Sequence, residues 1–246
     1  MKSHIKTFFV FDELVIPVKI YKERRLNTRL SILKDKVIIR MPVFLNKALY
    51  NKNIEWAKQK IKLQLDKNDR LRQNFTFKQY KTGDSFIING KKFFLNVNDN
   101  KASKTFKARL SGDTIYIEIP ADADPILVNK SIKTLLSRIM AQYFLPEISH
   151  RIHEINAKHF GFDINNIRLK YNKSNWGSRS AKNNINISTR LLFAPKDVQD
   201  YVFVHELAHF IEMNHSSRFW DIVKKVIPDY KEKEKWLKIH GHECDF

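Results

Sequence analysis

The segment His205-Glu206-Leu207-Ala208-His209, with His215 six residues further on, constrains the structure of this chain more than any other feature. Two histidines four residues apart on an α-helix lie one above the other, so their ring nitrogens can share one ion. The glutamate after the first histidine points about 100° around the helix, toward an ion-bound water. This is the HExxH spacing of zinc hydrolases, in which the glutamate acts as general base.

The residues around the motif favour a metal site over a pair of ordinary core histidines. Residues 197–204 lead into the motif and Phe210-Ile211 follow it, so the helix is apolar on most of its circumference and should be buried. Burying two histidines and two glutamates, Glu206 and Glu212, in such a helix costs free energy unless a binding partner replaces their lost hydration. A bound cation would do so.

His215 can reach the same ion only if the chain leaves the helix soon after His209. Six more residues of unbroken helix would carry it about 9 Å along the axis and to another face. We place the bend at Met213-Asn214, because asparagine tolerates the left-handed conformation that ends helices. The alternative for His215 is an exposed turn residue.

The donor set indicates a catalytic site rather than a structural one. Structural zinc is usually closed by four ligands, often cysteines, whereas catalytic zinc has three protein ligands and one water. The single cysteine, Cys244, lies two residues from the end of the sequence, where we expect a solvated thiol and not a ligand. One cysteine also excludes a disulfide framework and favours a reducing cytoplasm.

Residues well beyond the motif follow the pattern of a known family. They are Asn175 to Ser180 (NWGSRS), Ile185 to Ile187, Arg190 to Leu192, Ala194-Pro195, the motif itself, Asn214 to Ser216, Phe219-Trp220, Pro228, Tyr230 and Trp236-Leu237. In these residues the chain resembles the YgjP-like metal-dependent hydrolases, whose catalytic region is similar to the WLM and SprT groups of zinc proteases. The clear resemblance covers about residues 166–240.

The resemblance implies a zincin-like domain in which His205, His209 and His215 bind Zn²⁺ and Glu206 is the base. Asn175 and Arg179 depart from the family pattern, which has arginine and cysteine at these positions. We take Arg179 as a candidate contact to a substrate oxyanion or phosphate, because a guanidinium offers a fixed positive charge. The alternative is a surface arginine without a role.

The hydrophobic pattern predicts an α+β chain of two regions. Residues 1–124 are expected to form a β-rich N-terminal region with one helix over 53–71. Residues 125–246 are expected to form the zincin-like metal-binding catalytic domain, with both helices and strands.

Turn and breaker residues locate further elements. Asn89-Gly90 and Ser111-Gly112 predict two hairpins, and Pro146 should divide or kink a helical stretch over 125–160. A strand over 184–188 precedes the motif helix, and we expect an extended peptide substrate to pair with it. The alternative is an internal strand without a free edge.

The formal net charge is +19, of which +13 lies in residues 1–125. A basic face attracts nucleic acid, nucleotides or acidic partners. However, lysine, asparagine and isoleucine are all abundant, as in A/T-rich genomes, and that bias gives the same charge without a partner. No segment has the length of a signal peptide core or a membrane span, so we expect a cytoplasmic protein with no membrane partner.

These observations predict a zinc-dependent hydrolase, first of all a metallopeptidase that acts on a peptide or protein substrate with Glu206 as general base. One alternative keeps the metal and changes the substrate to a nucleotide phosphoanhydride, with Arg179 neutralising phosphate oxygens. Another is a nucleic-acid-associated module with weak or no catalysis.

Overall fold

The structure is a computed structural model that describes residues 4–11, 14–33, 35–73, 75, 80–100, 103–120, 123 and 125–246. Its contacts divide the chain into two compact units, Met1–Gln79 and Tyr80–Phe246. Each unit has a hydrophobic core of its own. Helices and strands are mixed in both units, which confirms the α+β class. Among the described residues, none of the helices combines the length and apolar character needed to cross a bilayer.

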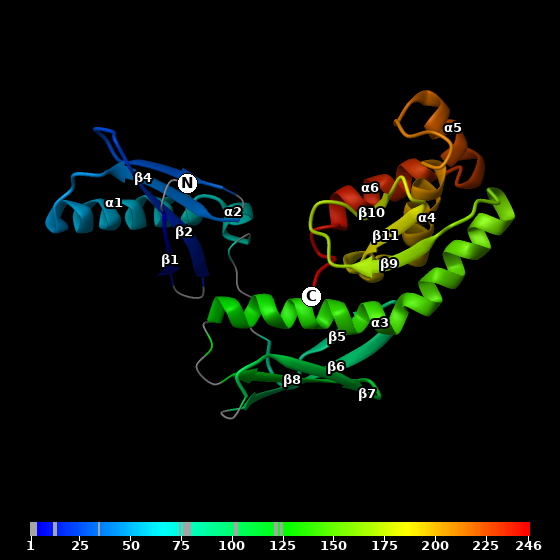
Figure 1. Cartoon of the computed structure of the whole chain (residues 1–246), viewed down its shortest axis with the longest axis horizontal. Helices are drawn as coiled ribbons and strands as arrows, with labels where there is room; N and C mark the ends of the chain where they lie inside the picture. Colours follow the sequence, from blue (N-terminus) through cyan, green and yellow to red (C-terminus); the bar gives the residue numbers. More distant parts are fainter. Residues whose placement is uncertain are drawn as a thin grey trace. The chain divides into compact units, whose positions relative to one another are not determined.

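The first unit is a four-stranded sheet with one long helix (Figure 1). The sheet has the order β1-β2-β4-β3, with β1 at His4–Phe11, β2 at Leu14–Glu23, β3 at Arg29–Ile32 and β4 at Val37–Pro42. Helix α1 covers Lys47–Asp66, and the short α2 covers Asp69–Gln73. The single helix predicted over 53–71 is therefore two, because the Asn68 side chain accepts the Leu71 N–H and starts a new helix.

The second unit begins with a sheet built from the two predicted hairpins. Its order is β5-β6-β8-β7, with β5 at Ser85–Ile88, β6 at Lys91–Asn100, β7 at Lys107–Ser111 and β8 at Thr114–Pro120. Both turn predictions are confirmed: Asn89 and Gly90 have φ values of 50° and 79°, and Gly112 has 60°. These are the left-handed values that two-residue hairpin turns require.

Helix α3, Pro125–His159, packs along this sheet and buries Leu136, Met140 and Phe144. Pro146 lies inside α3, and Figure 1 shows the helix bent rather than straight, as a proline without an N–H donor predicts. Because strands β5 to β8 share one core with α3, the unit boundary lies before residue 80 and not at the 124/125 position expected from the sequence.

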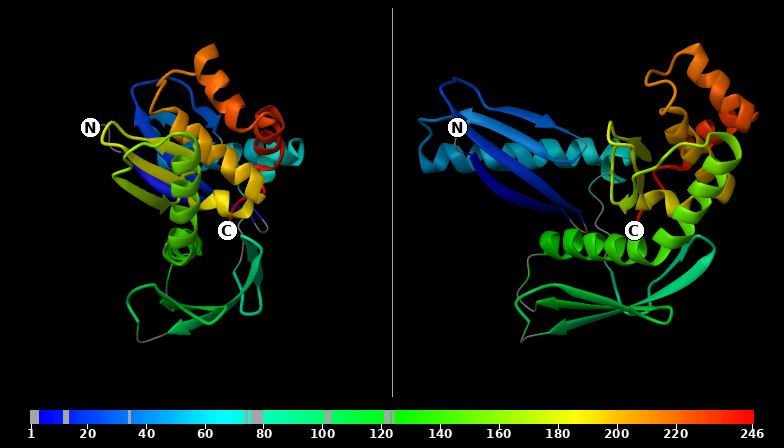
Figure 2. Two further views of the ribbon diagram at one scale, coloured as in Figure 1. Left: turned by 90° about the vertical axis from the view of Figure 1, so that its right-hand side faces the viewer. Right: turned by 45° about the vertical axis from the view of Figure 1, so that its right-hand side comes forward.

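A small sheet and the last three helices lie beside the C-terminal part of α3 (Figures 1 and 2). The elements are β9 at Asn166–Lys170, β10 at Gly177–Arg179, β11 at Asn184–Ser188, the 3₁₀ helix η1 at Thr189–Phe193, α4 at Lys196–Ala208, α5 at Ser217–Val226 and α6 at Tyr230–His240. The strand order is β10-β11-β9, so β11 is paired on both edges. The expectation that a substrate pairs with residues 184–188 is therefore wrong, since no edge of that strand is free.

The C-terminal tail is folded into the core of the second unit. Cys244 is only 2% exposed, so the expectation of a solvated thiol is wrong. The reason lies in Arg190, whose buried guanidinium donates to the backbone carbonyls of Lys173, Gly241 and Cys244. This guanidinium also stacks on Trp176, with 4.6 Å between its carbon and the ring centroid. Burial raises the pKa of Cys244 to about 11, so its sulfur stays a thiol at neutral pH.

Replacing Arg190 with methionine should lower the free energy of unfolding by about 3 kcal/mol, because buried carbonyls lose charged donors that methionine cannot replace. Urea unfolding measures the effect. Arg168→Met, at an exposed position of β9, is the matched control and should change stability by less than about 0.5 kcal/mol. Equal stability of the two variants would contradict the role of Arg190.

Candidate metal centre

The three histidines of the sequence motif lie together in the structure. One ring nitrogen of each of His205, His209 and His215 lies within 4.8 Å of the other two. The Nε2 atoms of His205 and His215 are 3.0 Å apart, and the ring centroids of the three pairs are 4.9 to 5.0 Å apart. Three convergent imidazole nitrogens are a donor set that suits zinc and related divalent ions.

The return of the chain after His209 brings His215 to the other two rings. Helix α4 ends at Ala208, whose carbonyl accepts the N–H groups of Ile211 and Glu212. The chain then bends at Met213 and Asn214, as predicted. The predicted left-handed conformation of Asn214 is wrong, because Asn89 and Asn183 are the only described non-glycine residues with positive φ.

The ring of His209 is oriented by the backbone of the same turn. Its Nδ1 lies 3.1 Å from the carbonyl oxygen of Glu212. Since a carbonyl only accepts hydrogen bonds, this contact places the proton on Nδ1 and leaves the Nε2 lone pair free for an ion. A backbone carbonyl has no signature in the sequence, so this contact could not be predicted.

The electrostatic environment keeps the motif histidines neutral. Burial, with the nearby His209 and His215 rings, lowers the pKa of His205 to about 3. Burial also lowers the pKa of His209. Both rings are therefore unprotonated at neutral pH, which is the state in which imidazole binds a metal.

Glu206 lies buried beside the histidines, with 4% of its surface exposed. The backbone N–H of Arg179 donates a hydrogen bond to its carboxylate. Gly177 lies so close that a Cβ at this position would be 2.5 Å from Oε1 of Glu206. Strand β10 thus holds the carboxylate in place, and only glycine leaves it room. Gly177 belongs to the NWGSRS segment, but the spacing of that segment gave no sign of this contact.

Strand β10 is the edge strand of the small sheet and lies next to α4. Two backbone groups on its unpaired edge nevertheless make hydrogen bonds within the protein. The Arg179 N–H donates to the Glu206 carboxylate, and the Gly177 carbonyl accepts a hydrogen bond from the Asn175 side chain at 3.0 Å. The strand therefore serves to position the candidate base.

In chelator-treated protein, the free energy of unfolding should fall as the pH rises from about 6.5 to 8. Burial raises the pKa of Glu206 from 4.5 to about 8, so in this range the folded protein keeps a proton that the unfolded chain has lost. The lowered pKa of His205 acts in the opposite direction only below about 6.5, since above it the unfolded histidine is also neutral.

Urea unfolding at several pH values measures this slope, which should approach about 1.4 kcal/mol per pH unit. Glu206→Gln has no proton to lose and should show no slope in this range. The same slope in both proteins would contradict the assignment.

A cavity of about 440 Å³ opens on the candidate centre, a volume within the usual range for ligand sites. It is lined by Asn175, Trp176, Gly177, Tyr201, Val202, His205, Glu206, Glu234, Leu237 and Lys238. Tyr201 lies one helical turn before His205, and this spacing could have revealed it. Glu234 and Lys238 come from α6, and nothing in their local sequence points to the site.

Arg179 does not line this cavity. Its guanidinium donates to Oδ1 of Asn183 at 2.6 Å, lies 3.3 Å from Sδ of Met213 and stacks over Phe210 at 4.7 Å. The side chain is thus held between the loop before β11 and the turn after α4. The part of Arg179 that reaches the centre is its backbone N–H.

The chain matches one family model and is similar to solved structures. The family model of the YgjP-like metallopeptidase domain matches residues 26–240. The chain is also similar to two crystal structures of metallopeptidase zymogens. Abylysin of Pyrococcus abyssi is 26% identical over 39% of this chain and 93% of its own, with a TM-score of 0.34. Jannalysin of Methanocaldococcus jannaschii is 25% identical over 37% and 92%, with a TM-score of 0.33.

No curated protein matches the chain significantly. The family model nevertheless spans most of the sequence, including the NWGSRS segment, the motif helix and all three histidines. The resemblance inferred from the sequence is thereby confirmed. The chain belongs to the YgjP-like metallopeptidase family.

Proposed function

We propose that the protein is a zinc-dependent metallopeptidase in which His205, His209 and His215 bind Zn²⁺ and Glu206 is the general base. The observation that carries the proposal is the convergence of three imidazole nitrogens within 4.8 Å, beside a carboxylate that is 4% exposed. Membership of a metallopeptidase family supports a metal-dependent hydrolase of peptide bonds.

The donor set fits the proposed ion. Two of the rings are neutral, and the Nδ1 contact of His209 leaves its Nε2 free. Three nitrogen ligands without a cysteine leave one coordination position open, as in catalytic zinc sites. When bound, Zn²⁺ supplies Lewis acidity for polarising a scissile carbonyl.

The chain's own residues supply proton transfer and orientation. The positive charge of a bound ion would favour the ionised form of Glu206, whose carboxylate is held by the Arg179 N–H. In that form Glu206 takes a proton from the attacking water and passes it to the leaving amine. Tyr201 lines the same cavity, with its ring 6.0 Å from that of His205. Burial raises the pKa of Tyr201, so its hydroxyl keeps its proton and can donate a hydrogen bond to a substrate oxygen.

The position of the Arg179 side chain does not favour the phosphoanhydride alternative. Its phosphate contact was to be Arg179, and that guanidinium is engaged by Asn183 and Phe210 outside the cavity. A nucleic-acid partner and a cytoplasmic location stay predictions from the sequence.

Purified protein incubated with casein and with a panel of nucleotides, each with and without chelator, tests the proposal. We expect casein cleavage that stops with chelator and returns when Zn²⁺ is added, and we expect intact nucleotides. Hydrolysis of nucleotides without cleavage of casein would overturn the peptidase assignment in favour of the phosphoanhydride alternative.

A further inference from the structure

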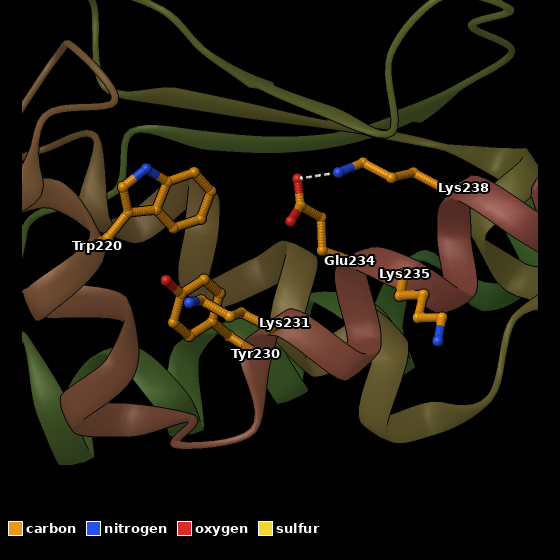
Figure 3. Close-up of a pocket in the computed structure, with 6 residues that line it drawn as sticks. All are labelled: Trp220, Tyr230, Lys231, Glu234, Lys235 and Lys238. Atoms are coloured by element: carbon orange, nitrogen blue, oxygen red, sulfur yellow. Dashed lines mark ion pairs between the residues drawn. The ribbon is translucent and has the colours of Figure 1, made fainter.

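A second cavity adjoins the candidate metal centre within the same unit. It has a volume of about 470 Å³ and is lined by Trp220, Tyr230, Lys231, Glu234, Lys235 and Lys238 (Figure 3). Glu234 and Lys238 line both cavities, so the two spaces share a wall. We call this second cavity the α6 subsite, because five of its six lining residues belong to α6.

Trp220 connects the α6 subsite to the histidines. Its ring centroid lies 5.9 Å from that of His205 and 5.8 Å from that of His215. The indole also stacks on Tyr230, with centroids 5.1 Å apart and an interplanar angle of 14°. A chain bound at the candidate centre therefore reaches the subsite across the width of one aromatic side chain.

The lining of the subsite carries an excess of positive charge. The lining has three lysines and one glutamate, and that glutamate is already paired with Lys238, with 2.9 Å between Nζ and Oε1. Lys231 and Lys235 have no ion-pair partner among the residues that the structure describes. Lys233 of the same helix differs, because Asp197 and Asp229 hold its ammonium group at 2.6 and 2.9 Å. Within α6, the two subsite lysines Lys231 and Lys235 are thus unpaired, whereas Lys233, which does not line the subsite, is paired.

We propose that the α6 subsite binds an acidic side chain of the peptide substrate and so determines specificity. The proposal rests on the proposed peptidase function. Lysine ammonium groups attract carboxylates without a demanding geometry, and the Trp220–Tyr230 stack offers an apolar wall to the methylene groups of aspartate or glutamate. Since an extended residue spans about 3.3 Å, the acidic residue should lie within about four positions of the cleaved bond.

Digestion of a proteome-derived peptide library by the zinc-loaded protein, followed by mass spectrometry, tests this specificity. We expect aspartate and glutamate to be enriched at one position within about four residues of the cleavage site. The double variant Lys231→Glu/Lys235→Glu should lose this enrichment and favour lysine and arginine there. The control Lys130→Glu/Lys170→Glu makes the same change in net charge at exposed positions that line neither cavity, and it should cleave like the wild type.

A binding experiment separates failure of the subsite from failure of the peptidase. The Glu206→Gln protein is titrated into N-acetylated, C-amidated glutamate–alanine peptides carrying an uncharged dye, and into their glutamine counterparts. We expect about tenfold tighter binding of the acidic peptides, a difference that shrinks at high salt and vanishes in the Lys231→Glu/Lys235→Glu background.

The two experiments have distinct outcomes. Acidic preference in binding without library cleavage would support the subsite and overturn the peptidase function. Library cleavage without any preference for acidic residues would overturn the subsite and leave the peptidase function standing. Equal affinity for the acidic and amide peptides would also overturn the subsite.

Discussion

Replacing Glu206 with glutamine should leave the bound metal in place and lower kcat by about 10³-fold. The variant keeps the length of the side chain and an oxygen that accepts the Arg179 N–H, so the packing of the centre is preserved. It cannot take a proton from water, and a general base contributes on the order of 10² to 10⁴ in rate.

Peptide turnover and metal content measured on the same preparation test this prediction. Glu212→Gln is the matched control, because the contact of Glu212 with His209 is made by its backbone carbonyl. The control should keep both activity and metal. A fully active Glu206→Gln protein would refute the assignment of the base.

Replacing Gly177 with alanine should lower kcat by about 10²-fold while the metal content stays unchanged. The added Cβ would lie 2.5 Å from Oε1, 2.7 Å from Cγ and 2.8 Å from Cδ of Glu206, so the carboxylate must move. A displacement of about 1 Å at a reacting group can cost about 10²-fold in rate. None of the three metal ligands is among the nearest atoms to this Cβ, so metal binding should persist.

Ser178→Ala, at the next position of β10, is the control and should remain close to wild type in kcat. Circular dichroism and metal analysis confirm that the Gly177→Ala protein is folded and loaded. Wild-type kcat in this variant would show that Glu206 can shift without loss of function, and it would contradict the role given to Gly177.

Local geometry explains why much of the centre could be predicted from the sequence. The spacing of His205 and His209 places both rings on one helix face, and the buried run before them predicts a buried helix. The same holds for Asn89-Gly90, whose backbone preferences specify a hairpin turn without reference to the rest of the fold.

Features that depend on distant contacts could not be predicted in this way. The alternation of β11 shows that one face is buried, but it does not show that both edges are paired. Cys244 lies in a polar segment and is buried through distant contacts such as that of Arg190, 54 positions earlier, which binds its carbonyl. Lys231, Lys235 and Lys238 are exposed on α6, and only the fold shows that they line a cavity together with Trp220.

The position of the unit boundary also depends on contacts between residues that are far apart in the sequence. The hairpins of β5 to β8 resemble the N-terminal strands in composition. The sequence pattern therefore predicted that they belong to one region with residues 1–79. Packing against α3 places them in the second core instead. Which core a strand joins depends on the helix that covers it, and that helix lies after the strands in the sequence.

Elemental analysis of the purified protein, combined with zinc titration of chelator-treated protein, tests the central claim most directly. We predict one transition-metal ion for each chain and a strong loss of affinity in His209→Ala and His215→Ala. Absence of bound metal together with no uptake on titration would contradict the account, as would a His215→Ala protein that binds zinc with undiminished affinity.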